Sequence, residues 1–157
     1  MTTRIEHDLL GTRDVPAEAY YGIHTLRAVE NFPLLGQPLH PELIAALALV
    51  KAAAARANAR TGKLPARLAE AIIRAAEEVA GGTLREQFLV DALQGGAGTS
   101  ANMNINEVLA NRALELLGEA KGAYHLLDPL EQVNLEQSTN DVFPTALRVA
   151  ALRLLLP

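Results

Sequence analysis

The sequence predicts a mainly α fold with a short irregular or β-hairpin segment at its N-terminal end. Three observations lead to this class. The 157 residues are 50% hydrophobic but only 4% aromatic, so Ala, Leu, Val and Ile carry the apolar content, which suits close-packed helices. After residue 40, apolar residues recur at helical spacing in several windows. Before residue 40, glycines and prolines interrupt the chain too often for a long helix.

Residues 1–40 are expected to form turns and short strands, because six residues divide them: Gly11, Pro16, Gly22, Pro33, Gly36 and Pro38. The first helix should begin at Pro41, which suits a first helical position. It should fade near Asn58 and stop by Gly62. Its apolar residues keep helical spacing: Leu43, Ile44, Leu47, Val50 and Ala54.

A second helix is expected after Pro65, with glycines 81–82 at its end. Residues 86–100 form a short apolar run that breaks into a glycine-rich loop. A third helix should follow over 101–118, and residues 119–137 should be a loop with a turn at Asp128-Pro129. The last helix is expected to start near Phe143, with Pro144 in its first turn.

This last helix is apolar on nearly every side. Between residues 142 and 156 the clearly polar side chains are those of Thr145, Arg148 and Arg153. Such a helix is normally buried on all sides. A domain of this size has too few neighbours to cover it, so we expect an apolar side to be exposed in a monomer and to drive self-association.

Composition and charge exclude several classes of partner. The formal net charge is −4, whereas phosphate binding favours a basic surface, so nucleic acid is not expected as the main partner. The absence of cysteine excludes disulfides and thiolate zinc sites. No segment resembles a signal peptide or a membrane span. We expect a cytoplasmic protein with no metal, no cofactor and no membrane partner.

The first polar loop is "QGGAGTS", residues 94–100. Its glycines allow a close backbone approach, and Thr99 and Ser100 add hydroxyls at the start of a helix. Unpaired amides and the helix dipole favour an anion at such a place. The alternative is a linker in which Thr or Ser caps the helix. The loop is not a Walker phosphate loop, because no lysine follows its glycines.

An unusual row of asparagines follows this loop, at Asn102, Asn104, Asn106 and Asn111. Asparagine is a mediocre helix former, and buried amides must find partners. The row could form a polar wall beside a site. The favoured interpretation is a structural network that joins helices, to which Glu107 and Arg112 also belong.

The second polar loop contains Ser138, Thr139 and Asn140, again before a helix. Taken alone, it is explained by capping of the helix by Asn140 or Asp141. Taken with the first loop, it suggests a receptor for a small carboxylate, because both loops carry hydroxyls and amides at a helix start and neither contains a basic residue.

At these two loops the sequence resembles a known family. "GGAGTSANMNINEVLANRALELLG" and "VNLEQSTNDVFPTA" resemble the first two signature regions of the aspartase/fumarase superfamily, and "RIEHDLLGTRDVPAEAYYGIHTLRAVENF" resembles its N-terminal segment. "QGGAGTS" and "KGAYHLL" are similar to its aspartate ammonia-lyase branch. The resemblance implies an N-terminal helical domain at residues 1–137 and the truncated start of a central helix bundle at 138–157.

The resemblance also implies a reaction. A Cβ proton is removed from L-aspartate to give a carbanion stabilised as an aci-carboxylate, and loss of ammonia then leaves fumarate. Thr99, Ser138 and Thr139 would contact the β-carboxylate, Asn140 with Thr99 would contact the amino group, and Ser100 is a secondary candidate. The family's serine base and its Thr-His pair do not occur in these residues. No catalytic residue is therefore assigned here, and this chain alone is expected to be inactive.

Assembly and alternatives follow from the same resemblance. The family forms homotetramers whose sites combine three subunits through the bundle. The alternative activity is that of a class II fumarase or another fumarate-forming lyase. The stretch "DPLEQVN" departs from the family's Pro-Asn-Asp run at Asp128, Leu130 and Glu131, which argues against a second carboxylate site of the fumarase kind. From another class, the chain could be a non-catalytic helical interaction module.

Overall fold

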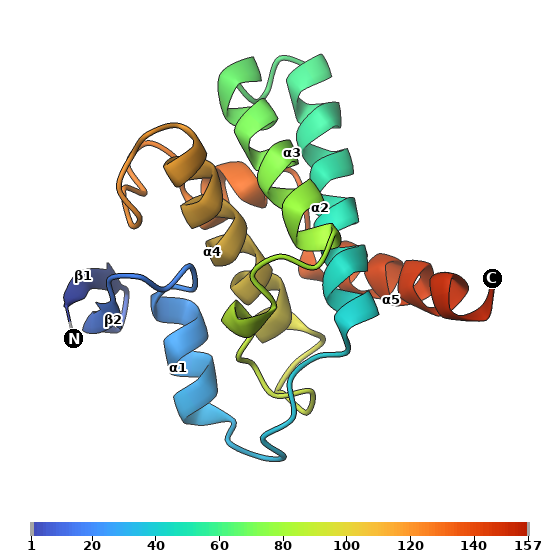
Figure 1. Cartoon of the computed structure of the whole chain (residues 1–157), viewed down its shortest axis with the longest axis horizontal. Helices are drawn as coiled ribbons and strands as arrows, with labels where there is room; N and C mark the ends of the chain where they lie inside the picture. Colours follow the sequence, from blue (N-terminus) through green and yellow to red (C-terminus); the bar gives the residue numbers. More distant parts are fainter. Residues whose placement is uncertain (1, 157) are drawn as a thin grey trace.

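The chain begins with a β-hairpin (Figure 1). The computed structural model describes residues 2–156, so Met1 and Pro157, which end the ranges predicted as domains, lie outside the described residues. Strand β1 (Thr3–Asp8) pairs antiparallel with β2 (Gly11–Pro16), and Asp8 lies opposite Gly11. The hairpin confirms the short strands expected in this region.

Helix α1 (Ile23–Asn31) was not predicted, although the described residues 2–40 contain no long helix, as expected. Its N-cap is Gly22, which has no side chain to bond the first amides. The carboxylate of Glu107 does this instead. It accepts hydrogen bonds from the backbone amides of Gly22 at 2.9 Å, His24 at 2.8 Å and Thr25 at 3.0 Å. The amide of Ile23 donates to the carboxylate of Glu6 at 2.8 Å, so the first turn of α1 is completed by two side chains distant in the sequence.

Helices α2 (Pro41–Arg60) and α3 (Ala66–Ala80) lie side by side and confirm the two helices predicted there (Figure 1). Pro41 is the first residue of α2, as expected. The ring of His40 caps this helix by accepting from the amide of Glu42 at 3.2 Å. The core between them is built largely from alanines, leucines and isoleucines, among them Ala46, Leu47, Ala48, Ile72, Ala75 and Ala76.

Helix α4 (Thr99–Leu116) runs through the middle of the molecule and contacts α1, α3 and α5 (Figure 1). A short 3₁₀ turn, η1 (Arg85–Gln87), precedes its loop. After α4, residues expected to be a loop with a turn contain a single π-helical turn, η2 (Pro129–Val133). The carboxylate of Asp128 caps this turn by accepting from the amides of Leu130 at 2.7 Å and Glu131 at 2.9 Å.

Helix α5 (Thr139–Leu155) begins earlier than predicted. We expected its start near Phe143 with Pro144 in the first turn, and this is wrong, because Ser138 is the N-cap and Pro144 lies inside the helix. Proline has no amide hydrogen, so the helical bond to the carbonyl of Asn140 is not made at this position. The helix tolerates this loss close to its start.

Helix α5 packs against α2 along one stripe and projects away from the remaining helices (Figure 1). The buried residues of the stripe recur every four positions, at Val142, Ala146 and Ala150. Apolar side chains on its other faces are exposed, among them Leu147, Leu152, Leu154 and Leu155. The expected exposure of an apolar side is confirmed. In the part of the chain that the structure describes, no helix combines the length and the apolar character needed to cross a bilayer.

Candidate functional site

The two polar loops lie next to each other, because α4 and α5 start at the same place. Asn102, one turn into α4, donates through its side-chain nitrogen to the hydroxyl of Thr139 at 3.1 Å. The backbone of Gly98 touches the ring of Phe143 so closely that an added Cβ would lie 2.3 Å from it. Gly98 also has a φ of 87°, so a side chain here would be strained in addition to clashing.

A cavity of about 390 Å³ lies between these two loops. The first loop contributes the backbone of residues 96–98, and the second contributes Asn140. The apolar wall comes from Phe143, Pro144 and Leu147 of α5. Asn140 is therefore the predicted site residue that faces the glycine-rich loop.

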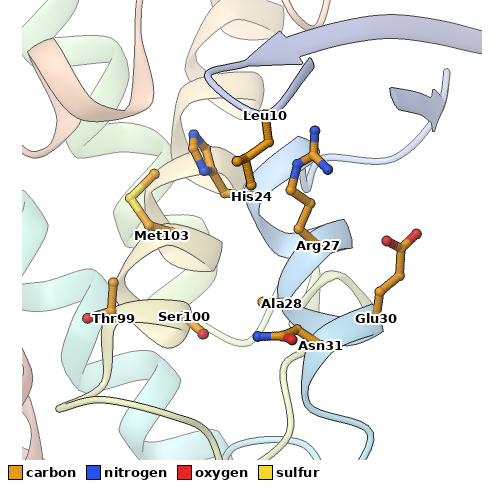
Figure 2. Close-up of a pocket in the computed structure, with 9 residues that line it drawn as sticks. All are labelled: Leu10, His24, Arg27, Ala28, Glu30, Asn31, Thr99, Ser100 and Met103. Carbon is orange, nitrogen blue, oxygen red and sulfur yellow. The ribbon is translucent and has the colours of Figure 1, made fainter. Parts of the chain in front are cut away.

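Thr99 and Ser100 line a second cavity of about 500 Å³, which lies between the start of α4 and one face of α1 (Figure 2). Helix α1 contributes His24, Arg27 and Asn31 to it. In Figure 2 the hydroxyl of Ser100 points toward α1, while that of Thr99 lies on the side away from α1. Thr99 and Ser100 thus line this cavity and Asn140 lines the first, whereas Ser138 and Thr139 line neither of the two.

The positive charge in the second cavity is already paired. The guanidinium of Arg27 binds both carboxylate oxygens of Asp8, at 2.7 and 2.9 Å. This pairing lowers the pKa of Asp8. An anion in the cavity would therefore depend mainly on hydroxyls and backbone dipoles, or would have to compete with Asp8 for Arg27.

The N-caps of α4 and α5 show whether the hydroxyls and amides of the two loops are used for capping, which the sequence left open. Gly98, not Thr99 or Ser100, is the N-cap of α4, so both hydroxyls belong to the first turn and are not used for capping. The amide of Ala101 is taken by the side chain of Gln94 at 2.8 Å.

In α5 the cap is Ser138, whose hydroxyl accepts from the amide of Asn140 at 3.2 Å. Capping by Asn140 or Asp141, the alternative stated for this loop, is therefore wrong. The hydroxyl of Ser138 is engaged by its own helix, and that of Thr139 is engaged by Asn102. Either hydroxyl can still donate its hydrogen to a ligand, because both bonds use it as an acceptor.

The asparagine row is a structural network, as favoured. Asn104 bonds the backbone at the end of the η1 turn, accepting from the amide of Leu89 at 3.1 Å and donating to the carbonyl of Gln87 at 3.0 Å. Asn111 donates to the carbonyl of Tyr20 at 2.8 Å. Arg112, expected in the same scaffold, pairs with Glu78 of α3 at 2.6 Å.

Sequence reasoning missed the contribution of α1 to the second cavity. His24 is one of the residues that α1 contributes. Its backbone amide donates a hydrogen bond to Glu107, while its ring lines the cavity. The one available signal was the spacing of His24 and Arg27, which places both on one face of a helix. The helix itself had not been recognised, so the signal was not usable.

Residues 11–156 match the model of a protein family described as "Lyase". The chain belongs to this family, the aspartase/fumarase superfamily. The resemblance stated for the two loops is thereby confirmed.

Members of the superfamily match along nearly the whole chain. An aspartate ammonia-lyase from Bacillus sp is 55% identical over 152 residues, which are 97% of this chain and 32% of the relative. A crystal structure named fumarate lyase:delta crystallin, from Brucella melitensis, has a TM-score of 0.95 and 55% identity, covering 97% of this chain and 36% of that one. A class II fumarase from Schistosoma mansoni has a TM-score of 0.90 and 37% identity, covering 95% and 32%.

These relatives confirm the predicted fold class, mainly α with an N-terminal hairpin. The chain spans about a third of the length of the curated relatives that it matches. Within the superfamily, identity is higher to the aspartate ammonia-lyase than to the class II fumarase.

Proposed function

We propose that this chain supplies the carboxylate-binding part of an aspartate ammonia-lyase, a carbon–nitrogen lyase that converts L-aspartate reversibly to fumarate and ammonia. The observation that carries the proposal is the adjacency of the starts of α4 and α5, joined by the bond from Asn102 to Thr139. The 55% identity to a Bacillus aspartate ammonia-lyase supports this substrate over malate, since identity to the class II fumarase is 37%.

The chemistry requires fixed dipoles around one carboxylate. Removal of the Cβ proton adds charge to the β-carboxylate of the substrate, and preorganised donors stabilise that charge, each by roughly 3–4 kcal/mol when well aimed. We assign Thr99, Ser138 and Thr139 to this carboxylate, with Ser100 as a secondary candidate. Asn140, together with Thr99, receives the amino group. The proton acceptor is assigned to a serine outside these residues.

The positions of the two cavities must be compatible with one substrate that contacts both Thr99 and Asn140. Thr99 and Asn140 line different cavities in the single chain, although both flank the same junction between α4 and α5. A ligand that bridges the junction would touch both. The proposal includes a homotetramer in which other subunits complete the site. In it, residues 138–157 belong to the central helix bundle, residues 1–137 form the N-terminal domain, and the enzyme works in the cytoplasm.

The test is a chimera in which this chain replaces the matching third of the Bacillus aspartate ammonia-lyase. The chimera and the unaltered relative are assayed for fumarate absorbance with L-aspartate and with L-malate, and this chain is assayed alone. We expect the chimera to form fumarate from L-aspartate and the chain alone to be inactive. Size-exclusion chromatography and circular dichroism establish that the chimera assembles and folds.

Other outcomes select the alternatives. Fumarate from L-malate and not from L-aspartate would favour a class II fumarase. An assembled, folded chimera that forms no fumarate from either substrate would contradict the lyase proposal and favour a non-catalytic helical module.

A further inference from the structure

A buried lysine supports the turn that leads into α5. Lys51 of α2 is fully buried, and its amine donates to the side-chain oxygens of Asn134 at 2.7 Å and Gln137 at 3.0 Å. Both partners are neutral amides and belong to the turn at residues 134–138, between η2 and α5. A buried amine without a countercharge is costly, so its presence at the centre of an alanine-rich helix calls for a specific use.

The same oxygen connects Lys51 to the candidate site. The side-chain oxygen of Asn134 also accepts hydrogen bonds from the side-chain nitrogens of Asn102 at 3.1 Å and Asn106 at 3.3 Å. Asn102 in turn donates to the hydroxyl of Thr139. A carbonyl oxygen has two lone pairs, so three donors compete for it. A change at Lys51 therefore changes how Asn102 is shared between Asn134 and Thr139.

The turn needs this support because its backbone is strained. Glu136 has a φ of 58°, a left-handed conformation that is unfavourable for a residue other than glycine. Side-chain amides hold the turn from within. Asn134 donates to the carbonyl of Gln137 at 3.1 Å, and Gln137 donates to that of Val133 at 2.9 Å. Lys51 binds the two residues that make these bonds.

We propose that Lys51 is a positioning residue, which acts through Asn134 and Gln137 to hold the turn at residues 134–138 and so places Ser138 and Thr139 at the start of α5. The value of this placement for a carboxylate ligand rests on the proposed function. The placement itself is a property of the chain and is measurable without any ligand.

Burial supplies a signature for the test, because it lowers the pKa of the Lys51 amine to about 7. Burial is the sole cause of this lowering. The charged pairs on the elements packed against α2, Glu42 with Arg153 of α5 and Arg56 with Glu77 of α3, do not contribute to it. The amine therefore changes its charge near neutral pH while its partners stay neutral.

The experiment is nuclear magnetic resonance on the labelled chain, comparing wild type with Lys51→Met. Lys63→Met is the matched control, because Lys63 reaches the same turn from solvent through a 2.9 Å ion pair with Glu136. In Lys51→Met the hydrogen-exchange protection of the amides of Gln137, Asn140 and Asp141 should fall by about tenfold or more. In Lys63→Met it should stay within about twofold.

The titration provides the second readout. In wild type, the Thr139 and Asn140 amide signals should shift with the same midpoint as the Cε signal of Lys51, and in Lys51→Met this shift should disappear. Shifts caused by histidines would persist in the variant and are thereby separated. Unchanged protection at the turn together with an unchanged titration at Thr139 would overturn the proposal.

A second variant covers the case in which circular dichroism shows Lys51→Met to be unfolded. Gln137→Leu keeps the amine but removes its bond to Gln137, together with the bonds from Gln137 to the carbonyls of Val133 and Leu135. It should also reduce protection at Asn140 and Asp141. Wild-type protection in a folded Gln137→Leu variant would overturn the proposal.

In the active chimera, Lys51→Met should lower kcat/KM for L-aspartate, whereas Lys63→Met should not. Wild-type kcat/KM in Lys51→Met would overturn the role in ligand placement. An inactive chimera carrying the wild-type chain would instead contradict the proposed function, and the exchange measurements would still decide the positioning role.

Discussion

At the scale of single residues, Thr99 and Asn140 are assigned to different parts of the substrate. In the chimera, Thr99→Ala removes a donor to the carboxylate whose charge grows as the proton leaves. It should therefore lower kcat and kcat/KM together, by about 10²–10³. The control is Thr83→Ala, an exposed threonine after α3 and outside both loops, which we expect to be neutral. Steady-state kinetics with L-aspartate measure both.

Asn140→Ala should have a different effect, because the ammonium that it contacts is present in the ground state as well. We expect it to raise KM for L-aspartate more than it lowers kcat. It should also weaken the discrimination between an amino and a hydroxyl leaving group, which parallel assays with L-malate measure. If Thr99→Ala and Asn140→Ala both keep wild-type kinetics, the two loops serve only to start their helices.

Lys51 should make stability depend on pH. Its pKa is about 7 in the folded chain and 10.5 as the ordinary value, so between these pH values the unfolded chain binds more protons than the folded one. Stability of the wild type relative to Lys51→Met should therefore rise with pH across this window, by about 1.4 kcal/mol for each pH unit. Urea unfolding of both proteins between about pH 7 and about pH 10 tests this, and a difference independent of pH would contradict it.

At the scale of elements, the first turn of α1 depends on the carboxylate of Glu107 from α4, in addition to that of Glu6. Glu107 also accepts from the hydroxyl of Thr25 at 2.6 Å, in addition to the three backbone amides. Glu107→Gln replaces one accepting oxygen with a donating group that faces amide hydrogens. The free energy of unfolding should fall by about 2–3 kcal/mol. Glu70→Gln on the exposed face of α3 is the control and should stay within about 0.5 kcal/mol. Equal stability of the two variants would show that α1 does not need this cap.

The elements that the sequence predicted well are those with local signals. Pro41 starts α2, glycines 81 and 82 follow α3, and Gly118 follows α4. Helix α1 was missed because its cap comes from Glu107 and not from a neighbouring side chain. The start of α5 was placed too late because Pro144 was taken for a first-turn residue, whereas the Ser138 cap starts the helix before it.

For the candidate site, too, only the parts with a local signal in the sequence could be predicted. The two loops could be paired from their hydroxyls and amides and from the family resemblance. That His24 and Arg27 line the same cavity as Thr99 could not be predicted, because it depends on how α1 packs against α4. Lys51 gave no signal either, since a lysine among alanines is usually solvated, and its burial results from the packing of α2 against the turn before α5.

At the scale of the whole molecule, α5 should bring copies of the chain together. Its exposed leucines include Leu147, Leu152 and Leu155, at 52%, 56% and 76% exposure, on a helix that projects from the rest. Apolar surface of this kind is removed from water by association. Sedimentation should show assembly that increases with concentration, and Leu152→Glu should weaken it. Ile5→Glu, at an exposed apolar position in the hairpin, should not. A monomer at all concentrations, with α5 ordered, would contradict this.

The cap of α1 also has a consequence for the order in which parts of the chain fold. Glu107 lies 82 to 85 positions along the chain from the backbone amides that donate hydrogen bonds to it. Helices α2 and α3 are joined by a short connection and can meet early, whereas closing the long segment between α1 and α4 is slow. During synthesis, the residues of α1 leave the ribosome well before Glu107 does. We expect the hairpin and α1, although made first, to acquire their structure last. Pulse-labelled hydrogen exchange during refolding should find their amides protected after those of α2 and α3.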